Sequence, residues 1–258
     1  MRVCVSVVSH GHGAEAGQLL TLLARGKGDT PVRRVILTLN VPEPGLPQAL
    51  HARAPWPFDL HIVENAAAKG FGANHNHAFA LDARLGASEG FAVVNPDISW
   101  QHDPFAALLH TLLEGDERVG VVYPVQTDAA GCRQDHERLL PTPARLVRRY
   151  LWPGARRELH SQQQPDWVNA AFLLLRRDVY ASVGGFDEAY HMYCEDVDLC
   201  LRLQLAGWQL RRADDVTVVH KAHRASRRDP RHLLWHVQSL LRLWRSRAYA
   251  VRGRQQAP

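Results

Sequence analysis

The stretch from residue 167 to residue 208 constrains the fold more than any other part of this 258-residue chain. It reads WVNAAFLLLRRDVYASVGGFDEAYHMYCEDVDLCLRLQLAGW. Residues 172–175 form a short apolar run typical of a buried strand, and the charged residues 176–178 predict the start of a short helix. Gly184 and Gly185 predict a sharp turn after that helix, because glycine adopts positive φ values without a steric penalty. The stretch therefore predicts a strand, a helix and a tight turn in succession.

A second helix is predicted from Glu195 to the residue before Gly207. Its apolar residues recur at the spacing of one helix face: Val197, Cys200, Leu201, Leu203 and Leu205. Glu195 and Asp196 therefore lie in the first turn, where free N–H groups and the helix dipole favour negative charge, so we expect both to be ionised at neutral pH. An ionised Asp that faces a cleft can act as a general base. Acidic residues also begin helices for stability alone, and Asp198 is expected to pair with Arg202.

Another carboxylate follows a different apolar run. Residues 91–94 read FAVV and end abruptly at Asn95-Pro96-Asp97, which predicts a strand that delivers Asp97 to its carboxyl end. Open α/β sheets bind ligands at that edge. An Asn-Pro-Asp turn without a ligand is the alternative for this motif taken by itself.

The order and spacing of GGFDE, YCEDVDLCLRL and AGW resemble the signature of glycosyltransferase family 2, particularly its bacterial rhamnosyltransferase-like members. The resemblance implies a GT-A-type α/β fold with a Rossmann-like mixed, mainly parallel central sheet flanked by helices. It implies that Asp196, beside Glu195, is the catalytic base for the acceptor hydroxyl. It also implies that Asp97 holds a divalent cation against the donor diphosphate, with Asn95 in place of the first Asp of a D-x-D motif. Mg²⁺ or Mn²⁺ suits such a site, because hard cations prefer carboxylate and phosphate oxygens.

The N-terminal region fits the same plan. Residues 3–8 predict a strand, HGHG a flexible turn, residues 14–25 a helix and residues 35–39 a second strand, and this alternation is typical of a parallel sheet. The resemblance places the nucleotide over the ends of these strands, at Ser9, His10 and Asn40. Many relatives have an Asp-Asn pair after the second strand, where this chain reads LTLNVPEPG.

A glycine-rich segment, KGFGANHNHAF, follows a third strand-like run that ends at Asn65. It resembles the N-x-G-x-x-x-A-x-N region that lines the nucleotide pocket in the family. The resemblance implies further donor contacts from Asn65, Lys69, Gly70 and Asn74. A glycine-rich turn without other signals is more often an ordinary loop.

The end of a later strand, at residues 216–219, delivers His220, with His223 and Ser226 close behind. In relatives a His after this strand approaches the metal or the diphosphate, and neutral imidazole is a suitable ligand for Mn²⁺. His220 is therefore the second predicted metal ligand. Histidine is abundant in this chain, which has 15, so a packing or surface role is the alternative.

Trp167 resembles an aromatic residue that family members place near the acceptor sugar. Asn169 and Ala170 stand where relatives have a small residue and Gly, so these three residues are the predicted acceptor contacts. A core Trp is the alternative. Residues 138–149, around a Pro-Thr-Pro sequence, are predicted to form an acceptor-side flap.

Length and charge predict one catalytic domain with a basic extension. Residues 1–223 are expected to form the domain, with a nucleotide-sugar half at about 1–100 and an acceptor half at about 101–223. Residues 224–258 hold nine arginines against one Asp and predict a basic amphipathic helix. This helix can rest on an anionic membrane surface or pack on the domain, and Arg227 and Arg228 can instead meet the diphosphate.

Cysteine usage and hydropathy indicate the compartment. The four cysteines have no zinc-site spacing, and no secretory signal is recognisable, so we expect reduced thiols in the cytoplasm. No segment approaches the roughly 20 apolar residues that span a bilayer. The prediction is a cytoplasmic protein, soluble or peripheral at the inner membrane surface.

The predicted function is inverting, metal-dependent transfer of a sugar from a nucleotide-diphosphate donor to a saccharide or lipid-linked oligosaccharide in cell-surface polysaccharide synthesis. Rhamnose from a dTDP-sugar is favoured through the resemblance, and UDP- and GDP-sugars remain open. Two other classes are a non-catalytic nucleotide-sugar-binding protein and a basic nucleic-acid-binding protein, the latter with strongly salt-dependent binding. The intact ED segment argues against both, and no nucleic-acid partner is expected.

Overall fold

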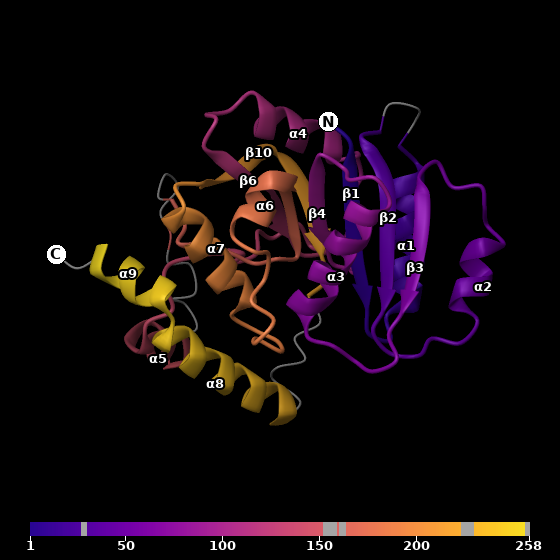
Figure 1. The fold of residues 1–258 in the computed structure, drawn as a ribbon. Helices are drawn as coiled ribbons and strands as arrows, with labels where there is room; N and C mark the ends of the chain where they lie inside the picture. The colour runs from indigo at the N-terminus through magenta and orange to yellow at the C-terminus, as the bar shows by residue number, and fades with distance from the viewer. Residues whose placement is uncertain (27–29, 152–158, 160–163, 223–229, 256–258) are drawn as a thin grey trace.

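The computed structural model describes residues 1–26, 30–151, 159, 164–222 and 230–255. Within them an eight-stranded sheet runs in the order β3-β2-β1-β4-β9-β6-β10-β5 (Figure 1). Its strands are β1 (Val3–Ser9), β2 (Val32–Leu39), β3 (Asp59–Glu64), β4 (Gly90–Val94), β5 (Ile98–Ser99), β6 (Val119–Thr127), β9 (Phe172–Arg176) and β10 (Gln209–His220). A separate pair joins β7 (Glu137–Arg138) to β8 (Trp167–Val168).

Strand direction brings distant parts of the chain to one edge of the sheet. The first four strands in that order are parallel, and β10 is parallel to β6. β9 is antiparallel to both of its neighbours, with Val94 of β4 opposite Phe172 of β9. The carboxyl ends of β1, β2, β4, β6 and β10 therefore share an edge with the amino end of β9. This mixed, mainly parallel sheet confirms the predicted fold class.

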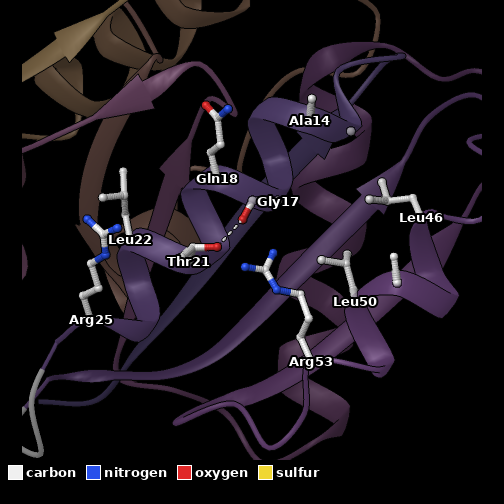
Figure 2. Close-up of a pocket in the computed structure, with 11 residues that line it drawn as sticks. Ala14, Gly17, Gln18, Thr21, Leu22, Arg25, Leu46, Leu50 and Arg53 are labelled. Carbon is white, nitrogen blue, oxygen red and sulfur yellow. Dashed lines mark hydrogen bonds between the residues drawn. The ribbon is translucent and has the colours of Figure 1, made fainter.

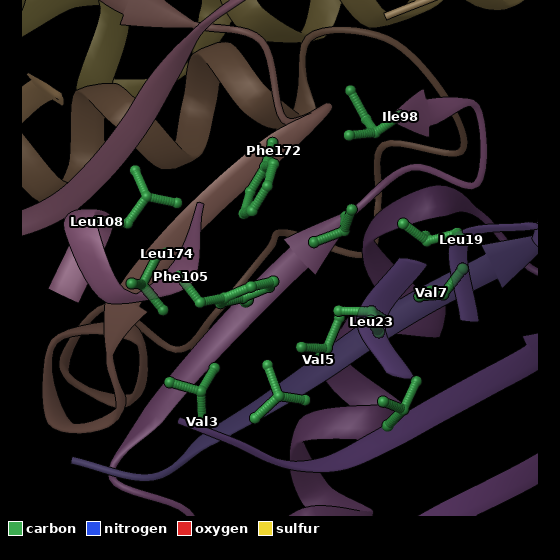
Figure 3. Close-up of a cluster of buried hydrophobic side chains, with 14 of the residues drawn as sticks. Val3, Val5, Val7, Leu19, Leu23, Ile98, Phe105, Leu108, Phe172 and Leu174 are labelled. Carbon is green, nitrogen blue, oxygen red and sulfur yellow. The ribbon is translucent and has the colours of Figure 1, made fainter. Parts of the chain in front are cut away.

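Helices cover both faces of the sheet, because side chains alternate between the faces along each strand. On one face, Val3, Val5 and Val7 of β1 pack with Leu19 and Leu23 of α1 (Gly13–Ala24), and α4 (Phe105–Leu113) extends this core (Figure 3). The other face is covered by α3 (Phe71–Arg84), α6 (Arg177–Ser182) and α7 (Glu195–Leu205). Burial on both faces explains why these strands are apolar runs without alternation.

A buried ion network joins the second face to the sheet. Asp82 of α3 is fully buried and accepts hydrogen bonds from Arg34 of β2 at 2.5 Å and from Arg177 of α6 at 2.6 Å. The backbone and hydroxyl of Ser88 each donate to it at 2.9 Å. Burial opposes the charge, but the hydrogen bonds from Ser88 and Arg34 prevail and hold the pKa of Asp82 below its usual value.

Three helices form a layer beside α7: α5 (Pro143–Leu151), α8 (Pro230–Arg245) and α9 (Arg247–Gln255), shown at the lower left of Figure 1. Leu243 of α8 is fully buried in the second core. The hydroxyl of Ser239 donates to the carbonyl of Met192 at 2.8 Å, and the indole of Trp244 donates to the carbonyl of Pro141 at 2.9 Å. α8 therefore connects the loop before α7 to the start of α5.

Most predicted elements are confirmed. The expected strands at 3–8, 35–39, 91–94 and 172–175 and the helices at 14–25 and from Glu195 are present. Asp198 and Arg202 form the expected ion pair at 2.6 Å. The strand predicted at 216–219 begins earlier, at Gln209, because its first half also pairs with β6. That half buries few apolar side chains, so the apolar pattern did not predict it. The C-terminal helix is present as two helices, α8 and α9. In the described part of the chain, no helix is long and apolar enough to cross a bilayer.

Candidate active site

The predicted metal ligands meet where β4 and β10 end. Antiparallel pairing of β5 with β10 sets Ile98 opposite His220, one residue after Asp97. Nε2 of His220 lies 3.6 Å from Oδ2 of Asp97, and the N–H of Ala222 donates to the same oxygen at 3.0 Å. Both side chains are mostly buried, with about a tenth of each exposed. Two residues 123 positions apart in sequence thus share one corner of the sheet edge.

This donor set fits a divalent cation. A 3.6 Å separation between a carboxylate oxygen and an imidazole nitrogen is close to the roughly 3 Å between neighbouring ligands of an octahedral ion with bonds of about 2.1 Å. No group of three or more His, Cys, Asp or Glu side chains among the described residues could hold a metal. Diphosphate oxygens and water would have to complete the shell. The predicted contributions of His223, Ser226 and the arginines at 227 and 228 fall outside the described residues.

The ED pair begins α7, as predicted, and burial affects both carboxyl groups. Oδ1 of Asp196 accepts from the N–H of Val197 at 2.8 Å. Burial nevertheless raises the pKa of Asp196 to about 6, so it is mostly ionised at pH 7 and a stronger base than a free Asp. Glu195 is 6% exposed, and burial raises its pKa well above the usual value. Desolvation thus opposes the helix-dipole effect from which an ionised Glu195 is predicted.

The backbone before α7 is strained. Tyr193 and Cys194 have φ values of 70° and 64°, in the left-handed region that residues other than glycine rarely adopt. The hydroxyl of Tyr193 hydrogen-bonds Nδ1 of His232 at 2.8 Å, and Ser239 of α8 holds the adjacent Met192 carbonyl. The C-terminal helix thus fixes the turn that presents Asp196.

The predicted acceptor residues lie beside Asp196. Asn169 and Gln126 exchange two side-chain hydrogen bonds, at 2.7 and 3.0 Å. The indole of Trp167 donates to a backbone carbonyl at 2.9 Å, and the Arg138 guanidinium lies 4.9 Å from its ring centre. Arg138 therefore covers part of the ring that was expected to contact the sugar. Arg138 begins the acceptor-side flap predicted at 138–149, whereas Gln126 had no local signal, because strand pairing within the sheet brings it to the site.

A cavity of about 690 Å³ opens next to this carboxylate. Its walls come from β7, β8, α5, α7 and α8, and they include both members of the ED pair. Trp167 and Asn169 line it as well, in agreement with their predicted place near the acceptor. The cavity has the volume and the mixture of apolar and polar walls that are typical of small-molecule sites.

The predicted donor-binding asparagines form a closed network. Nδ2 of Asn65 donates to Oδ1 of Asn40 at 2.9 Å and to Oδ1 of Asn74 at 2.7 Å. Asn40 also exchanges hydrogen bonds with the backbone of Lys69 and lies 3.1 Å from Nδ1 of His10. Asn74 is fully buried in this network, and its contact with ribose or phosphate stays a prediction. The network positions the loop that exposes Lys69 and His10.

Gly70 lets two segments of the chain pack closely. A Cβ at this position would lie 2.7 Å from the carbonyl oxygen of His191, and the N–H of Phe71 donates to the same oxygen at 3.0 Å. The glycine therefore allows α3 to approach the loop before α7. Its predicted role was to let the nucleotide approach the backbone closely.

Ser9 is also a positioning residue. It is fully buried, its hydroxyl donates to Oε1 of Glu43 at 2.5 Å, and it accepts from the N–H of His12 at 3.0 Å. Glu43 also accepts from the N–H of Gly11 at 3.2 Å. The hydroxyl of Ser9 is therefore engaged within the protein, and the contact of this residue with the nucleotide stays a prediction. Glu43 belongs to the segment LTLNVPEPG, which differs from the family pattern after the second strand. That difference was the only sequence signal near Glu43.

A second hollow, of about 600 Å³, lies between α1 and α2 (Leu46–His51) (Figure 2). Figure 2 shows Arg25 and Arg53 at its rim, with the hydroxyl of Thr21 bonded to the carbonyl of Gly17 at 2.7 Å. The described residues that line it include no carboxylate, histidine or cysteine. It offers neither a general base nor a metal ligand, so the catalytic assignment goes to the cavity beside Asp196.

Comparison with known proteins decides the family. N-acetylglucosaminyl-diphospho-decaprenol L-rhamnosyltransferase of Mycobacterium tuberculosis (strain ATCC 25618 / H37Rv) is 32% identical to this chain over 225 residues, which are 80% of this chain and 72% of that protein. The chain belongs to the rhamnosyltransferase-like members of glycosyltransferase family 2. Rhamnosyltransferase WbbL of Escherichia coli (strain K12) is 27% identical to this glycosyltransferase over 249 residues, 93% of this chain and 91% of that one. No protein-family model matches the chain.

A solved structure agrees on the fold of this glycosyltransferase. The mannosyltransferase PcManGT from Pyrobaculum calidifontis, in complex with GDP-Man and Mn²⁺, superposes with a TM-score of 0.60 at 17% identity. The match covers 93% of this chain and 64% of that one, so this chain spans less than two thirds of the solved protein. The GT-A-type architecture expected from the sequence is confirmed.

Proposed function

We propose that this glycosyltransferase moves rhamnose from dTDP-rhamnose to a saccharide carried on a lipid diphosphate, in cell-surface polysaccharide synthesis. The observation that carries the proposal is Asp196, a carboxylate with a raised pKa that lines a cavity of about 690 Å³. The relatives supply the sugar, because one is named for rhamnose transfer to a decaprenol-linked acceptor. Residues 1–100 would bind the donor and residues 101–223 the acceptor.

The chemistry follows from the proposed roles of the residues. Asp196 takes the proton from an acceptor hydroxyl as its oxygen attacks the anomeric carbon, and the nucleotide diphosphate leaves from the opposite face, which inverts the configuration. A divalent cation held by Asp97 and His220 would neutralise the charge of the leaving group. Lys69 and His10 are exposed on the donor side, where they can contact the nucleotide.

Transfer assays with defined substrates test this function. We expect mass spectrometry to detect one added deoxyhexose on a GlcNAc-diphospho-lipid acceptor with dTDP-rhamnose, and little product with UDP-glucose or GDP-mannose. Donor binding with no product on any saccharide acceptor would favour the non-catalytic alternative and overturn the proposal.

Substitution of Asp97 tests the metal site by a readout other than activity. With dTDP and Mn²⁺ at about 100 times the dissociation constant, the wild type should gain roughly 2.7 kcal/mol of stability, a rise in Tm of roughly 5 to 10 °C. Asp97→Asn should lose the Mn²⁺-dependent part, because an amide is a weaker ligand for a hard cation. Asp215→Asn, an exposed carboxylate on β10, is the matched control and should retain the full shift. An unchanged Mn²⁺ effect in Asp97→Asn would remove Asp97 from the metal site.

Peripheral membrane contact is part of the proposal, because a lipid-linked acceptor stays in the bilayer. α8 exposes four large apolar side chains, each 42% to 56% accessible: Leu233, Leu234, Val237 and Leu241. α5 adds Val147 and Leu151, at 55% and 63%. Exposed arginines accompany them on both helices, including Arg148 and Arg245. Such a surface is typical of helices that lie in an anionic membrane interface.

Vesicle flotation tests this contact. The double variant Leu234→Gln/Val237→Gln should bind vesicles that contain phosphatidylglycerol at least about tenfold more weakly than the wild type, because it removes apolar surface from the interface. Its activity on a water-soluble acceptor should be unchanged. Leu113→Gln changes an equally exposed leucine on α4 and should bind as the wild type does. Equal losses in both variants would contradict the assignment to α8.

A further inference from the structure

Three arginine side chains line the cavity described above. Arg138 belongs to β7, and Arg145 and Arg149 belong to α5. Arg149 forms an ion pair with Asp135, and Nε of Arg138 lies 3.3 Å from the same carboxylate. Arg145 donates to the carbonyl of Leu140 at 3.0 Å and pairs with no carboxylate among the described residues. Asp135 is thus the carboxylate partner of both Arg138 and Arg149, and the positive charge of Arg145 is added to theirs.

Arg145 forms no ion pair with the two carboxylates among the described residues that line the cavity, Glu195 and Asp196 of α7. A neutral saccharide has hydroxyl groups but no charge for several guanidinium groups to bind. A phosphate matches them, because the planar guanidinium donates two parallel hydrogen bonds to a pair of phosphate oxygens. The charge of the cavity thus indicates an anionic ligand.

The donor diphosphate does not account for this charge. Asp97 and His220, which we propose hold the donor's metal, are absent from the described residues that line the cavity. They lie at the ends of β4 and β10, whereas Arg145 and Arg149 lie on α5, beside α8. The three arginines that line the cavity are therefore separate from the proposed donor site.

The walls of the cavity combine three kinds of surface. Asp196 and Asn169 supply hydrogen-bonding groups, and the three arginines supply positive charge. Leu146, Leu233 and Leu240 supply apolar wall from α5 and α8. The same two helices also expose large apolar side chains. A ligand that joins a sugar, an anionic group and a hydrocarbon chain would find a matching surface for each part.

From this arrangement we infer that Arg145, with Arg149 and Arg138, binds the diphosphate that links the acceptor saccharide to its lipid. The inference rests on the proposed function, since it names the anionic group of the proposed acceptor. Arg145 holds this group so that the terminal sugar reaches Asp196. Arg145 is thus a residue that selects diphosphate-linked acceptors over free saccharides.

Two acceptors that differ only in the diphosphate test the inference. Calorimetry would measure binding of GlcNAc-diphospho-dodecyl and of the dodecyl glycoside of GlcNAc, without donor. The wild type should bind the diphosphate compound more tightly, and Arg145→Gln should weaken that binding by at least about tenfold, as expected for lost charge-assisted hydrogen bonds. Binding of the neutral glycoside should not change. Arg145→Lys should restore part of the affinity, because it keeps the charge but not the two-pronged geometry.

Arg148→Gln is the matched control, because Arg148 lies on the same helix, is exposed and does not line the cavity. It should bind both compounds as the wild type does. The inference is overturned if Arg145→Gln weakens binding of both compounds equally, or if it keeps the full preference for the diphosphate compound. Selective loss in Arg145→Gln without transfer by the wild type to either compound would sink the proposed function and leave the diphosphate site standing.

Discussion

Asp196→Asn should lower the rate of sugar transfer by roughly 10²- to 10⁴-fold, the usual contribution of a positioned general base. An amide keeps the size of the side chain and its hydrogen bond from Val197 but cannot accept the hydroxyl proton. Donor binding should be retained, because the proposed donor contacts lie elsewhere on the sheet edge. Single-turnover rates with dTDP-rhamnose, together with a thermal shift by dTDP and Mn²⁺, would measure the two effects separately.

The pH profile gives this prediction a second readout. Burial raises the pKa of Asp196 to about 6, and only the ionised carboxylate can take a proton. In the wild type, kcat/KM should therefore fall about tenfold per pH unit below that pKa and level off above it. The residual activity of Asp196→Asn should lack this acidic limb. A variant that keeps more than about a tenth of the wild-type rate, or that keeps the limb, would assign the base elsewhere.

Asp82→Ala should destabilise the fold by about 3 to 5 kcal/mol, which is the usual cost of leaving a buried charge without its partner. Arg34 is 2% exposed and would lose the carboxylate that it now contacts at 2.5 Å. Arg177, at 2.6 Å, and both hydrogen bonds from Ser88 would lose the same acceptor. The free energy of unfolding in urea measures the loss.

An exposed ion pair is the control for this variant. Asp116→Ala breaks the contact of Asp116 with Arg118 at 2.7 Å, but water screens that pair, so the loss of stability should be much smaller than in Asp82→Ala. The pKa of Asp82 is lowered in the folded state, so its contribution is present above the unfolded pKa and is lost as pH falls through the folded pKa. The stability difference between wild type and Asp82→Ala should therefore shrink in acid. Equal losses in the two variants would show that burial does not decide the energetics of the network.

Local sequence patterns predicted the two carboxylates on which the proposed chemistry depends. Asp97 ends an apolar run and Asp196 begins an amphipathic one, and both signals lie within about ten residues. The desolvation of Glu195 could not be predicted, because the local pattern does not contain its cause. The helix dipole can be read from position in the helix, whereas desolvation depends on the segments that fold over the residue.

Partners that lie far apart in sequence could not be predicted. Arg34 and Asp82 are 48 residues apart, and many polar residues of the chain could have filled either place. The left-handed turn at Tyr193 and Cys194 also has no local signal, because a glycine would normally mark it. That turn persists because α8, more than 30 residues later, holds it. Only the assembled tertiary structure determines such contacts.

The reversed direction of β9 separates the segments proposed to bind the donor from the segment proposed to bind the acceptor. The residues proposed to bind the donor enter the shared edge from the carboxyl ends of strands, whereas the segment before Phe172 enters the same edge from the opposite direction. The two segments meet at one backbone contact, because the carbonyl of Ala171 accepts from the N–H of Asn95 at 2.8 Å, just after β4. That contact needs no particular side chain, so the side chains before Phe172 can be replaced to suit another acceptor while the backbone that leads to Asp97 keeps its hydrogen bond.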